Sequence, residues 1–141
     1  FYIRTTSLAL SRMYNSIAAR YGITQTIGYL LTYVEREGTP STKLAQQLGM
    51  KNSSLTRLLK KMEKDGCIYR MVDKHDKRVV RIFLTEKGVQ RRRIAKTTVL
   101  QFNEKLSEQI SKEDLKTFFR VFDVIKHQVA QELEDQVSIE H

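Results

Sequence analysis

The spacing of apolar residues changes once along this chain, and that change limits the folds available to it. Through most of the sequence, apolar residues recur every three or four positions, as they do on one face of an α-helix. Residues 67–72 and 79–84 are instead rich in β-branched and aromatic residues, and a polar, charged turn separates them. We therefore expect a mainly α-helical fold with one small β-hairpin.

The limits of the expected helices follow from residues that commonly start or stop helices. Hydroxyl and amide side chains cap helix N-termini, and glycine ends helices. In chain order these residues are Gly22 at the end of the first helix, Thr24 and Gly38 around the second, Ser41 and Gly49 around the third, Asn52 or Ser53 and Gly66 around the fourth, Thr85 before the fifth and Ser111 before the sixth. The expected core consists of Ile27, Leu30, Leu31, Val34, Leu44, Ala45, Leu48, Leu55, Leu58, Leu59 and Met62.

A short helix over Ser41–Leu48, a glycine turn and a longer helix over Ser53–Lys64 make a helix-turn-helix. Ala45 fits this interpretation, because the two helices cross closely and a larger side chain would push them apart. The outer face of the longer helix is polar and basic, which suits the major groove of DNA. Taken alone, the pattern is equally typical of an ordinary amphipathic helix with a basic solvent face. The candidate DNA contacts here are Ser41, Thr42, Asn52, Ser53, Ser54, Thr56, Arg57, Lys60 and Lys61.

The hairpin favours the first of these interpretations. A helix-turn-helix that is followed directly by a two-stranded hairpin with a basic tip has the element order of a winged helix. The turn Asp73–Arg78 forms the tip, and its residues His75, Lys77 and Arg78 are further candidate DNA contacts. They suit an adjacent minor groove, since narrow A·T-rich stretches attract arginine.

The net charge of +9 supports the same interpretation through its distribution. Residues 51–96 include fifteen Lys or Arg and five acidic residues, whereas the rest of the chain holds ten and eleven. All of the positive excess therefore lies in the central third. A diffuse excess would indicate only a solvated surface, but a concentrated one is typical of a surface that binds a polyanion.

Residues 41–88 resemble the DNA-binding lobe of the MarR (multiple antibiotic resistance regulator) family. The strings that carry the resemblance are Thr42-Lys43-Leu44-Ala45, Ser53-Ser54-Leu55-Thr56-Arg57-Leu58, Asp65-Gly66, Asp76-Lys77-Arg78 and Leu84-Thr85-Glu86-Lys87-Gly88. The resemblance implies that the longer helix faces the major groove through Ser53, Ser54, Thr56 and Arg57. It also implies that Arg78 enters the minor groove and that Asp76 holds the shape of the wing. The chain departs from the pattern at His75, where such proteins often carry arginine.

The resemblance further implies that helices before and after the lobe build a dimerisation domain. We therefore divide the chain into a dimerisation helix at 1–23, a winged helix-turn-helix lobe at 24–88 and dimerisation helices at 89–141. The last helix carries an apolar stripe with heptad-like spacing, and a two-fold homodimer is the simplest way to bury it. Packing of the stripe against the first helix is the alternative. The expected dimerisation residues are Leu10, Ile17, Leu115, Phe118, Phe122, Ile125 and Val129.

In proteins of this family, small aromatic or phenolic compounds bind between the dimer helices and the DNA-binding lobe, and the resemblance implies such a cleft here. The residues that could line it are Met13, Tyr14, Tyr21, Tyr29 and Tyr33. The same residues would equally suit the hydrophobic core, so both interpretations stay open.

Other chemistry finds little support in the sequence. The single cysteine, Cys67, excludes an intrachain disulfide, suits a reducing cytosol and lies where a small buried residue is expected. His75, His127 and His141 are scattered, without partners at metal-ligand spacing. Because no phosphate loop, nucleophile elbow or carboxylate pair is present, we expect no cofactor, no metal and no enzymatic activity.

No apolar run approaches the roughly 18 residues that span a bilayer, and no signal-peptide pattern opens the sequence. Phe1 is an unusual first residue, and the sequence leaves open whether residues precede it. Together, these features predict a cytoplasmic, sequence-specific transcriptional regulator, a repressor that binds a palindromic operator in double-stranded DNA as a homodimer. Its DNA affinity is expected to change with a small ligand.

Two alternatives stay open. One is a constitutive or architectural DNA-binding protein without an effector, and a footprint confined to palindromes would argue against it. The other is a winged helix used only for contact with an acidic protein partner, and salt-sensitive binding to duplex DNA would argue against that.

Overall fold

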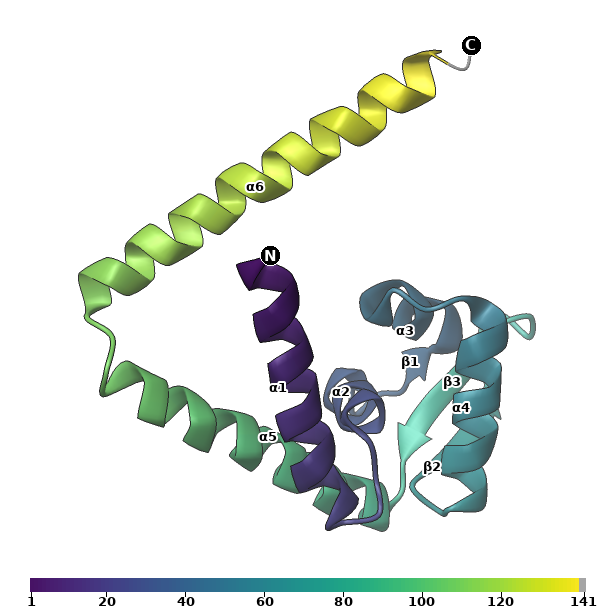
Figure 1. Cartoon of the computed structure of the whole chain (residues 1–141). Coiled ribbons are helices and arrows are strands. Elements are labelled where there is room, and N and C mark those ends of the chain that lie inside the picture. Colours follow the sequence, from purple (N-terminus) through teal and green to yellow (C-terminus); the bar gives the residue numbers. More distant parts are fainter. Residues whose placement is uncertain (140–141) are drawn as a thin grey trace. The chain divides into compact units, whose positions relative to one another are not determined.

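The computed structural model describes residues 1–139, which form six helices and one small sheet (Figure 1). In chain order the elements are α1 (Tyr2–Ala19), α2 (Gln25–Tyr33), β1 (Thr39–Pro40), α3 (Ser41–Leu48), α4 (Asn52–Lys64), β2 (Ile68–Val72), β3 (Val80–Leu84), α5 (Glu86–Ser107) and α6 (Lys112–Ile139). The expected mainly helical fold with a small β-hairpin is confirmed. The chain divides into two compact units, Phe1–Val99 and the part from Leu100 onward, which are described separately.

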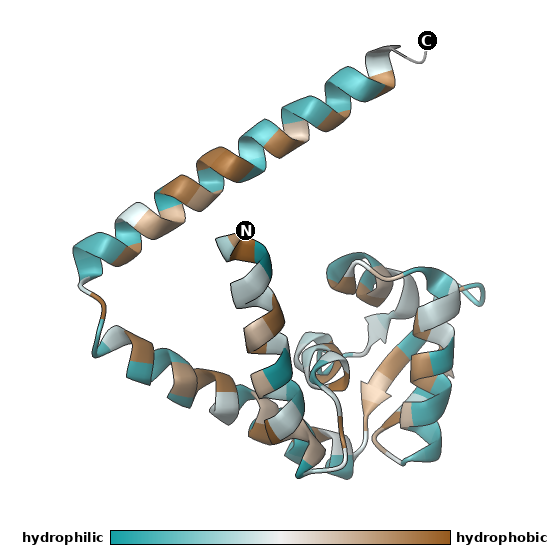
Figure 2. Ribbon diagram, viewed as in Figure 1, coloured by the Kyte–Doolittle hydropathy of each residue, from teal (hydrophilic) through white to brown (hydrophobic). Residues whose placement is uncertain are grey.

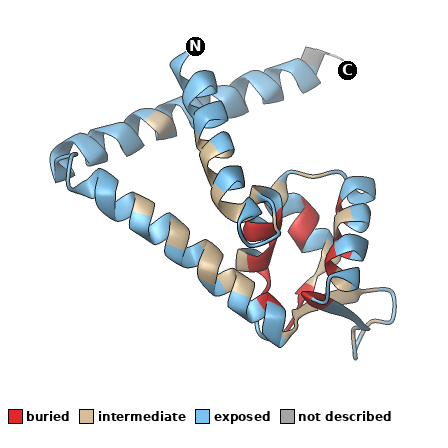
Figure 3. Ribbon diagram, turned by 60° about the horizontal axis from the view of Figure 1, so that its bottom comes forward, coloured by how far each residue is buried: buried red, intermediate tan, exposed pale blue. Residues whose placement is uncertain are grey.

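Apolar residues occur in every helix (Figure 2), but the two units bury them to different extents. In residues 100–138, no side chain is buried, and only Phe102 and Phe122 are half-buried. In the first unit, buried residues gather on α2, α3, α4 and the sheet (Figure 3). Over the described residues, none of the helices is both long and apolar enough to cross a membrane.

The core of the first unit agrees closely with the core expected from the sequence. It consists of Ile27, Leu30, Leu31, Val34, Leu44, Ala45, Leu55, Leu59, Met62, Cys67, Ile68 and Ile82. Of the expected core residues, only Leu48 and Leu58 are half-buried, and both pack against this cluster. The core therefore holds α3 and α4 against α2 on one side and against the sheet on the other.

The sheet has three strands rather than the two of the expected hairpin. β3 lies between β2 and β1, and both pairings are antiparallel. In the hairpin, Tyr69 lies opposite Phe83 and Met71 opposite Arg81. On the other side of β3, Thr39 lies opposite Ile82. β1 is only two residues long and ends at a proline, which is why the alternation of the sequence did not reveal it.

The helix α2 ends earlier than expected because of contacts made by a residue of β1. Gly38 was expected to stop this helix, but the helix ends at Tyr33 and Val34 is already extended, with ψ 116°. The hydroxyl of Thr39 accepts a hydrogen bond from the N–H of Glu35 at 2.8 Å and donates one to the carbonyl of Tyr33 at 3.4 Å. This buried threonine therefore closes the chain back on the last turn of α2, which leaves Gly38 in a tight turn before β1.

Most of the expected caps are confirmed, and one is wrong. The side chains of Thr24, Thr85 and Ser111 each accept a hydrogen bond from a backbone N–H in the first turn of the following helix. Neither Asn52 nor Ser53 caps α4, however. Its N-cap is Lys51, whose side chain makes no capping bond, and Asn52 lies within the first turn.

The strand β3 passes into α5 through a close contact with the end of α4. The N–H of Thr85 donates to the carbonyl of Cys67 at 3.1 Å, and its hydroxyl donates to the carbonyl of Gly66 at 2.6 Å. The Cys67 carbonyl also lies against Gly88, where an added Cβ would be only 2.0 Å from its oxygen. Gly88 is therefore required by the closeness of two backbones, which fixes α5 against the start of β2.

Candidate nucleic-acid interface

The helix-turn-helix is built as the sequence predicts. Gly49 ends α3 in the left-handed conformation with φ 61°, and the N–H of Met50 donates to the carbonyl of Ala45 at 3.0 Å. Ala45 is buried where α3 meets α4, which agrees with the need for a small residue there. Leu55, Leu59 and Met62 turn α4 toward the core, so the opposite face of this helix is left to solvent.

That solvent face carries the candidate DNA contacts. Of the nine candidates in α3 and α4, all are exposed except Ser41, which is half-buried. The four cationic side chains on this face of α4 are those of Arg57, Lys60, Lys61 and Lys64. Lys64 was expected as the last residue of this helix and is not among the candidate contacts.

A groove lies between α3 and the start of α4, with a volume of about 480 Å³. Its lining residues are Thr42, Ala45, Gln46, Gly49, Met50, Lys51 and Asn52. The structure therefore brings together Thr42 and Asn52, two candidates that are ten positions apart in the sequence. It adds Gln46 and Lys51, which the sequence analysis missed. Lys51 directly precedes the helix, and its charge and position were visible in the sequence.

The tip of the hairpin is ordered by Asp73. One carboxylate oxygen accepts hydrogen bonds from the N–H groups of His75 and Asp76, at 2.7 and 3.0 Å. The other oxygen accepts from the Nε of Arg81. The Arg81 guanidinium, followed by the two backbone N–H groups, holds the pKa of the Asp73 carboxyl well below its usual range. Asp73 therefore remains a carboxylate that organises the turn, a role that the sequence analysis did not assign to it.

Asp76 accepts a second set of hydrogen bonds in the same tip. Its Oδ1 accepts from the N–H and the Nε of Arg78, at 3.0 and 3.1 Å, and its Oδ2 accepts from Nη2 at 3.2 Å. The Arg78 side chain lowers the pKa of the Asp76 carboxyl. The Arg78 side chain is nevertheless 90% exposed. These contacts fit the implied role of Asp76 in holding the wing, with Arg78 oriented and accessible.

The candidate ligand-binding residues lie outside the buried core. Tyr21, Tyr29 and Tyr33 are exposed, whereas Met13 and Tyr14 are half-buried. Partial burial, followed by the nearby Tyr29, raises the pKa of the Tyr14 hydroxyl. Tyr21, Tyr29 and Tyr33 are therefore not core residues, whereas both interpretations stay open for the half-buried Met13 and Tyr14. A ligand-binding role stays a prediction.

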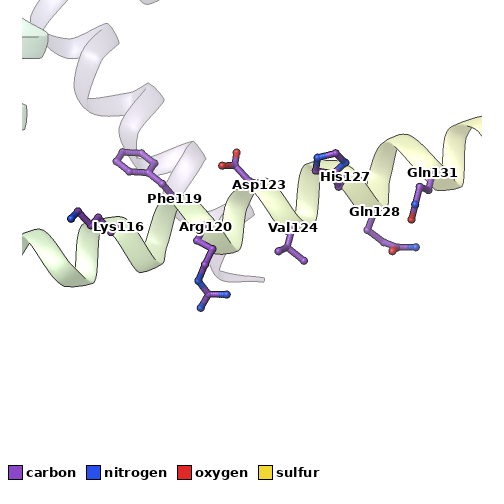
Figure 4. A pocket seen from close by; sticks show the side chains of 8 residues that line it. All are labelled: Lys116, Phe119, Arg120, Asp123, Val124, His127, Gln128 and Gln131. Carbon is purple, nitrogen blue, oxygen red and sulfur yellow. The ribbon is translucent and has the colours of Figure 1, made fainter.

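The candidate dimerisation residues are apolar and largely uncovered. Leu115, Phe118, Ile125 and Val129 are all exposed, and Leu10, Ile17 and Phe122 are half-buried. A separate hollow of about 610 Å³ runs along the polar side of α6 (Figure 4). All of the residues that line it come from this one helix, so it is an open surface without an opposing wall.

The cysteine and the histidines form no metal-binding group among the described residues. Cys67 is buried and unpaired with another cysteine. No group of His, Cys, Asp and Glu among the described residues could hold a metal ion. His75 lies in the wing tip and His127 on α6, whereas His141 lies outside the described residues.

Comparison with known proteins finds one matching family model. Residues 29–80, which include α3, α4 and most of the hairpin, match the family model described as MarR family. Over this part of the sequence, the chain is similar to the MarR family. The MarR-family match agrees with the resemblance found in the sequence, including the strings in α3, α4 and the wing tip.

Two relatives of this chain are named as regulators. Over 90 residues it is 36% identical to the HTH-type transcriptional regulator TtmR of Methylorubrum extorquens, a match that covers 62% of this chain and 46% of that protein. It is 32% identical to the HTH-type transcriptional regulator SarZ of Staphylococcus haemolyticus, over 63% of this chain and 61% of that protein. The chain therefore matches less than two thirds of the length of either relative.

Solved structures confirm the fold of this chain. The crystal structure of the Staphylococcus aureus MepR–DNA complex aligns with a TM-score of 0.82 and 22% sequence identity, over 90% of this chain and 94% of that one. The transcriptional regulator SlyA aligns with a TM-score of 0.79 and 23% identity, over 94% of both chains. At such identities the likeness establishes the winged-helix fold alone.

Proposed function

We propose that this chain binds double-stranded DNA in a sequence-specific manner and regulates transcription as a homodimeric repressor, without enzymatic activity. The observation that carries the proposal is the exposed basic surface of one winged-helix lobe, formed by α4 and the tip of the hairpin. The relatives named as transcriptional regulators and the neighbour crystallised with DNA support it.

In this proposal, α4 enters the major groove, where some of its side chains contact bases and others contact phosphates. Arg57 lies near the N-terminal end of the helix, where it can reach base edges and pair with guanine through two hydrogen bonds. Lys60 and Lys61 lie one turn further on and contact phosphates, which adds affinity without sequence information. The exposed Arg78 of the wing tip enters an adjacent minor groove.

The homodimer rests on the uncovered stripe of α6. Phe118 is 53% exposed and Val129 is 52% exposed, although both belong to the heptad-like pattern. A second copy of the chain would cover this surface and would set two recognition helices about 34 Å apart, as a palindromic operator requires. A small aromatic effector that changes this spacing would bind near Tyr14 and Tyr29, since Tyr29 lies close enough to Tyr14 to add to the rise in the pKa of its hydroxyl.

The experiment that tests the function begins with selection of duplexes from a random-sequence library by the unmodified chain. Binding of a selected and a random duplex is then titrated at several salt concentrations. Arg57→Ala should cost roughly 1–3 kcal/mol on the selected duplex and relax base choice there. Lys60→Ala should weaken both duplexes alike and reduce the salt slope by about one.

Lys116→Ala, which removes an exposed lysine on α6, is the matched control and should leave the salt slope unchanged. Absence of salt-sensitive duplex binding would reject the proposal in favour of a protein-binding winged helix. Equal binding to every duplex would instead indicate an architectural protein.

A further inference from the structure

The outward face of β3 makes two contacts with a single residue of the lobe. Arg81 and Phe83 are two positions apart, so their side chains lie on the same face of the sheet. The Phe83 ring lies directly on Gly38, where an added Cβ would be 2.4 Å from Cζ. The N–H of Arg81 Nη1 donates to the carbonyl of Gly38 at 2.9 Å. Gly38 has φ +83° and no side chain, which is what allows both contacts.

The turn that carries Gly38 is held to the rest of the first unit by further contacts. Thr39 is completely buried and binds the backbone of Tyr33 and Glu35. From α5, the Nη1 of Arg92 donates to the carbonyl of Val34 at 2.9 Å. The turn between α2 and β1 is therefore a fixed part of the lobe, and a side chain that binds Gly38 is anchored to it.

Arg81 connects this anchor to the wing tip. While its Nη1 binds Gly38, its Nε donates to the carboxylate of Asp73, which is only 10% exposed. Asp73 in turn binds the N–H of Asp76, and Asp76 holds the side chain of Arg78. A continuous series of hydrogen bonds therefore runs from the α2–β1 turn to the arginine that we place in the minor groove.

We propose that Arg81 is a positioning residue for DNA binding, which fixes the wing tip to the lobe and so presents Arg78 without contacting DNA itself. This inference rests on the proposed function. A two-stranded hairpin that extends from a domain is only marginally ordered by its own pairing. Ordering it during binding would reduce the affinity, so a wing that is fixed beforehand binds more tightly.

A double-mutant cycle tests this role on the whole 141-residue chain with a duplex selected from a random library. Arg78→Ala and Arg81→Gln should each lower the affinity about tenfold. If Arg81 acts through Arg78, the double variant should bind no more weakly than Arg81→Gln alone. Losses that multiply to about a hundredfold would overturn the proposal, because Arg81 would then act independently of the wing contact.

Arg70→Gln is the matched control, since Arg70 lies in the same sheet and is paired with an acid, Glu63, but reaches neither Gly38 nor Asp73. Any loss of DNA affinity that Arg70→Gln causes should multiply with the loss caused by Arg78→Ala. Hydroxyl-radical footprints give a second readout: Arg81→Gln should remove the same minor-groove protection as Arg78→Ala, and retained protection would overturn the proposal.

Thermal unfolding shows whether each variant is folded. If Arg81→Gln does not fold, the cycle is run with Arg81→Lys, which keeps the charge and can reach only one of the two acceptors. The role is supported if Arg81→Lys lowers the DNA affinity less than Arg78→Ala does and if the two losses of affinity do not multiply. The two proposals fail differently. A chain that selects no duplex rejects the proposed function, whereas tight selective binding with multiplicative losses rejects only the role of Arg81.

Discussion

The winged-helix lobe and α6 both carry many apolar residues, but they place them in opposite environments. In the lobe, Leu30, Leu31 and Leu44 are completely buried. On α6, Phe118 and Val129 keep about half of their surface exposed. The reason is geometric, because three helices and a sheet enclose a core, whereas one 28-residue helix cannot enclose a core by itself. The lobe therefore carries its own stability, and α6 needs another surface.

The polar contacts differ in the same way. In the first unit, the guanidinium groups of Arg81 and Arg92 reach backbone carbonyls of the lobe that are 43 and 58 positions away. On α6, Lys126 pairs with Asp123 and Gln128 with Glu132, both within one turn of the same helix. Local contacts of this kind contribute only about 0.2–0.5 kcal/mol each. The lobe is therefore shaped by tertiary contacts, whereas α6 is shaped by its own helical periodicity.

The largest effect is expected on the uncovered stripe of α6. Phe122→Asp would place a charge next to Phe118, whose ring centroid is 4.6 Å from that of Phe122. If a second copy covers this surface, the unpaired buried charge should cost several kcal/mol, roughly 3–5, and dissociate the dimer. Light scattering should then fall from twice the chain mass to 16.5 kDa. Gln131→Asp, on the polar side of α6, should stay dimeric, and a monomeric unmodified chain would contradict the prediction.

A comparably large effect is expected where two backbones meet in the lobe. Gly88→Ala would place a Cβ 2.0 Å from the Cys67 carbonyl oxygen, so the chain must shift, at a cost of about 3 kcal/mol. Gly28→Ala is the matched control, because its Cβ would lie at an ordinary 3.6 Å from that of Ala95. This helical glycine should tolerate alanine or gain about 0.5–1 kcal/mol. Chemical denaturation measures both, and equal midpoints would show that the lobe is less tightly packed than the structure indicates.

A smaller effect is expected from a single long-range hydrogen bond. Arg92→Ala leaves the carbonyl of Val34 without its guanidinium donor, which should destabilise the first unit by about 1–2 kcal/mol. The adjacent Arg93 is exposed, and Arg93→Ala should change the stability by less than about 0.5 kcal/mol. Denaturant titration of the two variants compares them directly. Identical stabilities would mean that the contact between α5 and the end of α2 adds nothing.

The smallest effect concerns pH. Because folding lowers the pKa of Asp73 below its ordinary value of 3.8, its carboxylate contributes stability that is complete above this value and is lost as the pH falls below it. The stability difference between the unmodified chain and Asp73→Asn should therefore be constant from pH 5 to 7 and should shrink below about pH 3.8. A difference that changes between pH 5 and 7 would contradict the prediction.

Much of the lobe could be predicted because its elements are marked locally. The caps Thr24, Thr85 and Ser111, the stop at Gly49 and the alternation around Ile82 are all properties of neighbouring residues. The outer face of α4 followed from helical spacing alone, and this is why the candidates Thr56 and Arg57 are exposed as expected. The tip of the wing was also recognisable, since a charged turn between two strand-like segments predicts a hairpin.

The contacts that hold the lobe together could not be predicted in this way. Nothing in the sequence pairs Arg81 with Gly38, because the two are 43 positions apart and neither belongs to a motif. β1 is too short to show a pattern, and its effect on the end of α2 appears only when Thr39 is buried. The roles of Asp73 and Gly88 likewise depend on partners that are distant in sequence and close in space.

By itself, the sequence determined the helical segments, the hairpin, the buried faces and the surface on which the positive charge gathers, since each depends on the order of nearby side chains. Only the tertiary structure decided where α2 stops, which carboxylate organises the wing, and that one arginine joins the wing tip to the lobe. The physical reason is that helical periodicity and capping act over a few residues, whereas an arginine fork and a glycine contact need a side chain and a backbone group from distant parts of the sequence to meet, as Arg81 Nη1 and the carbonyl of Gly38 do at 2.9 Å.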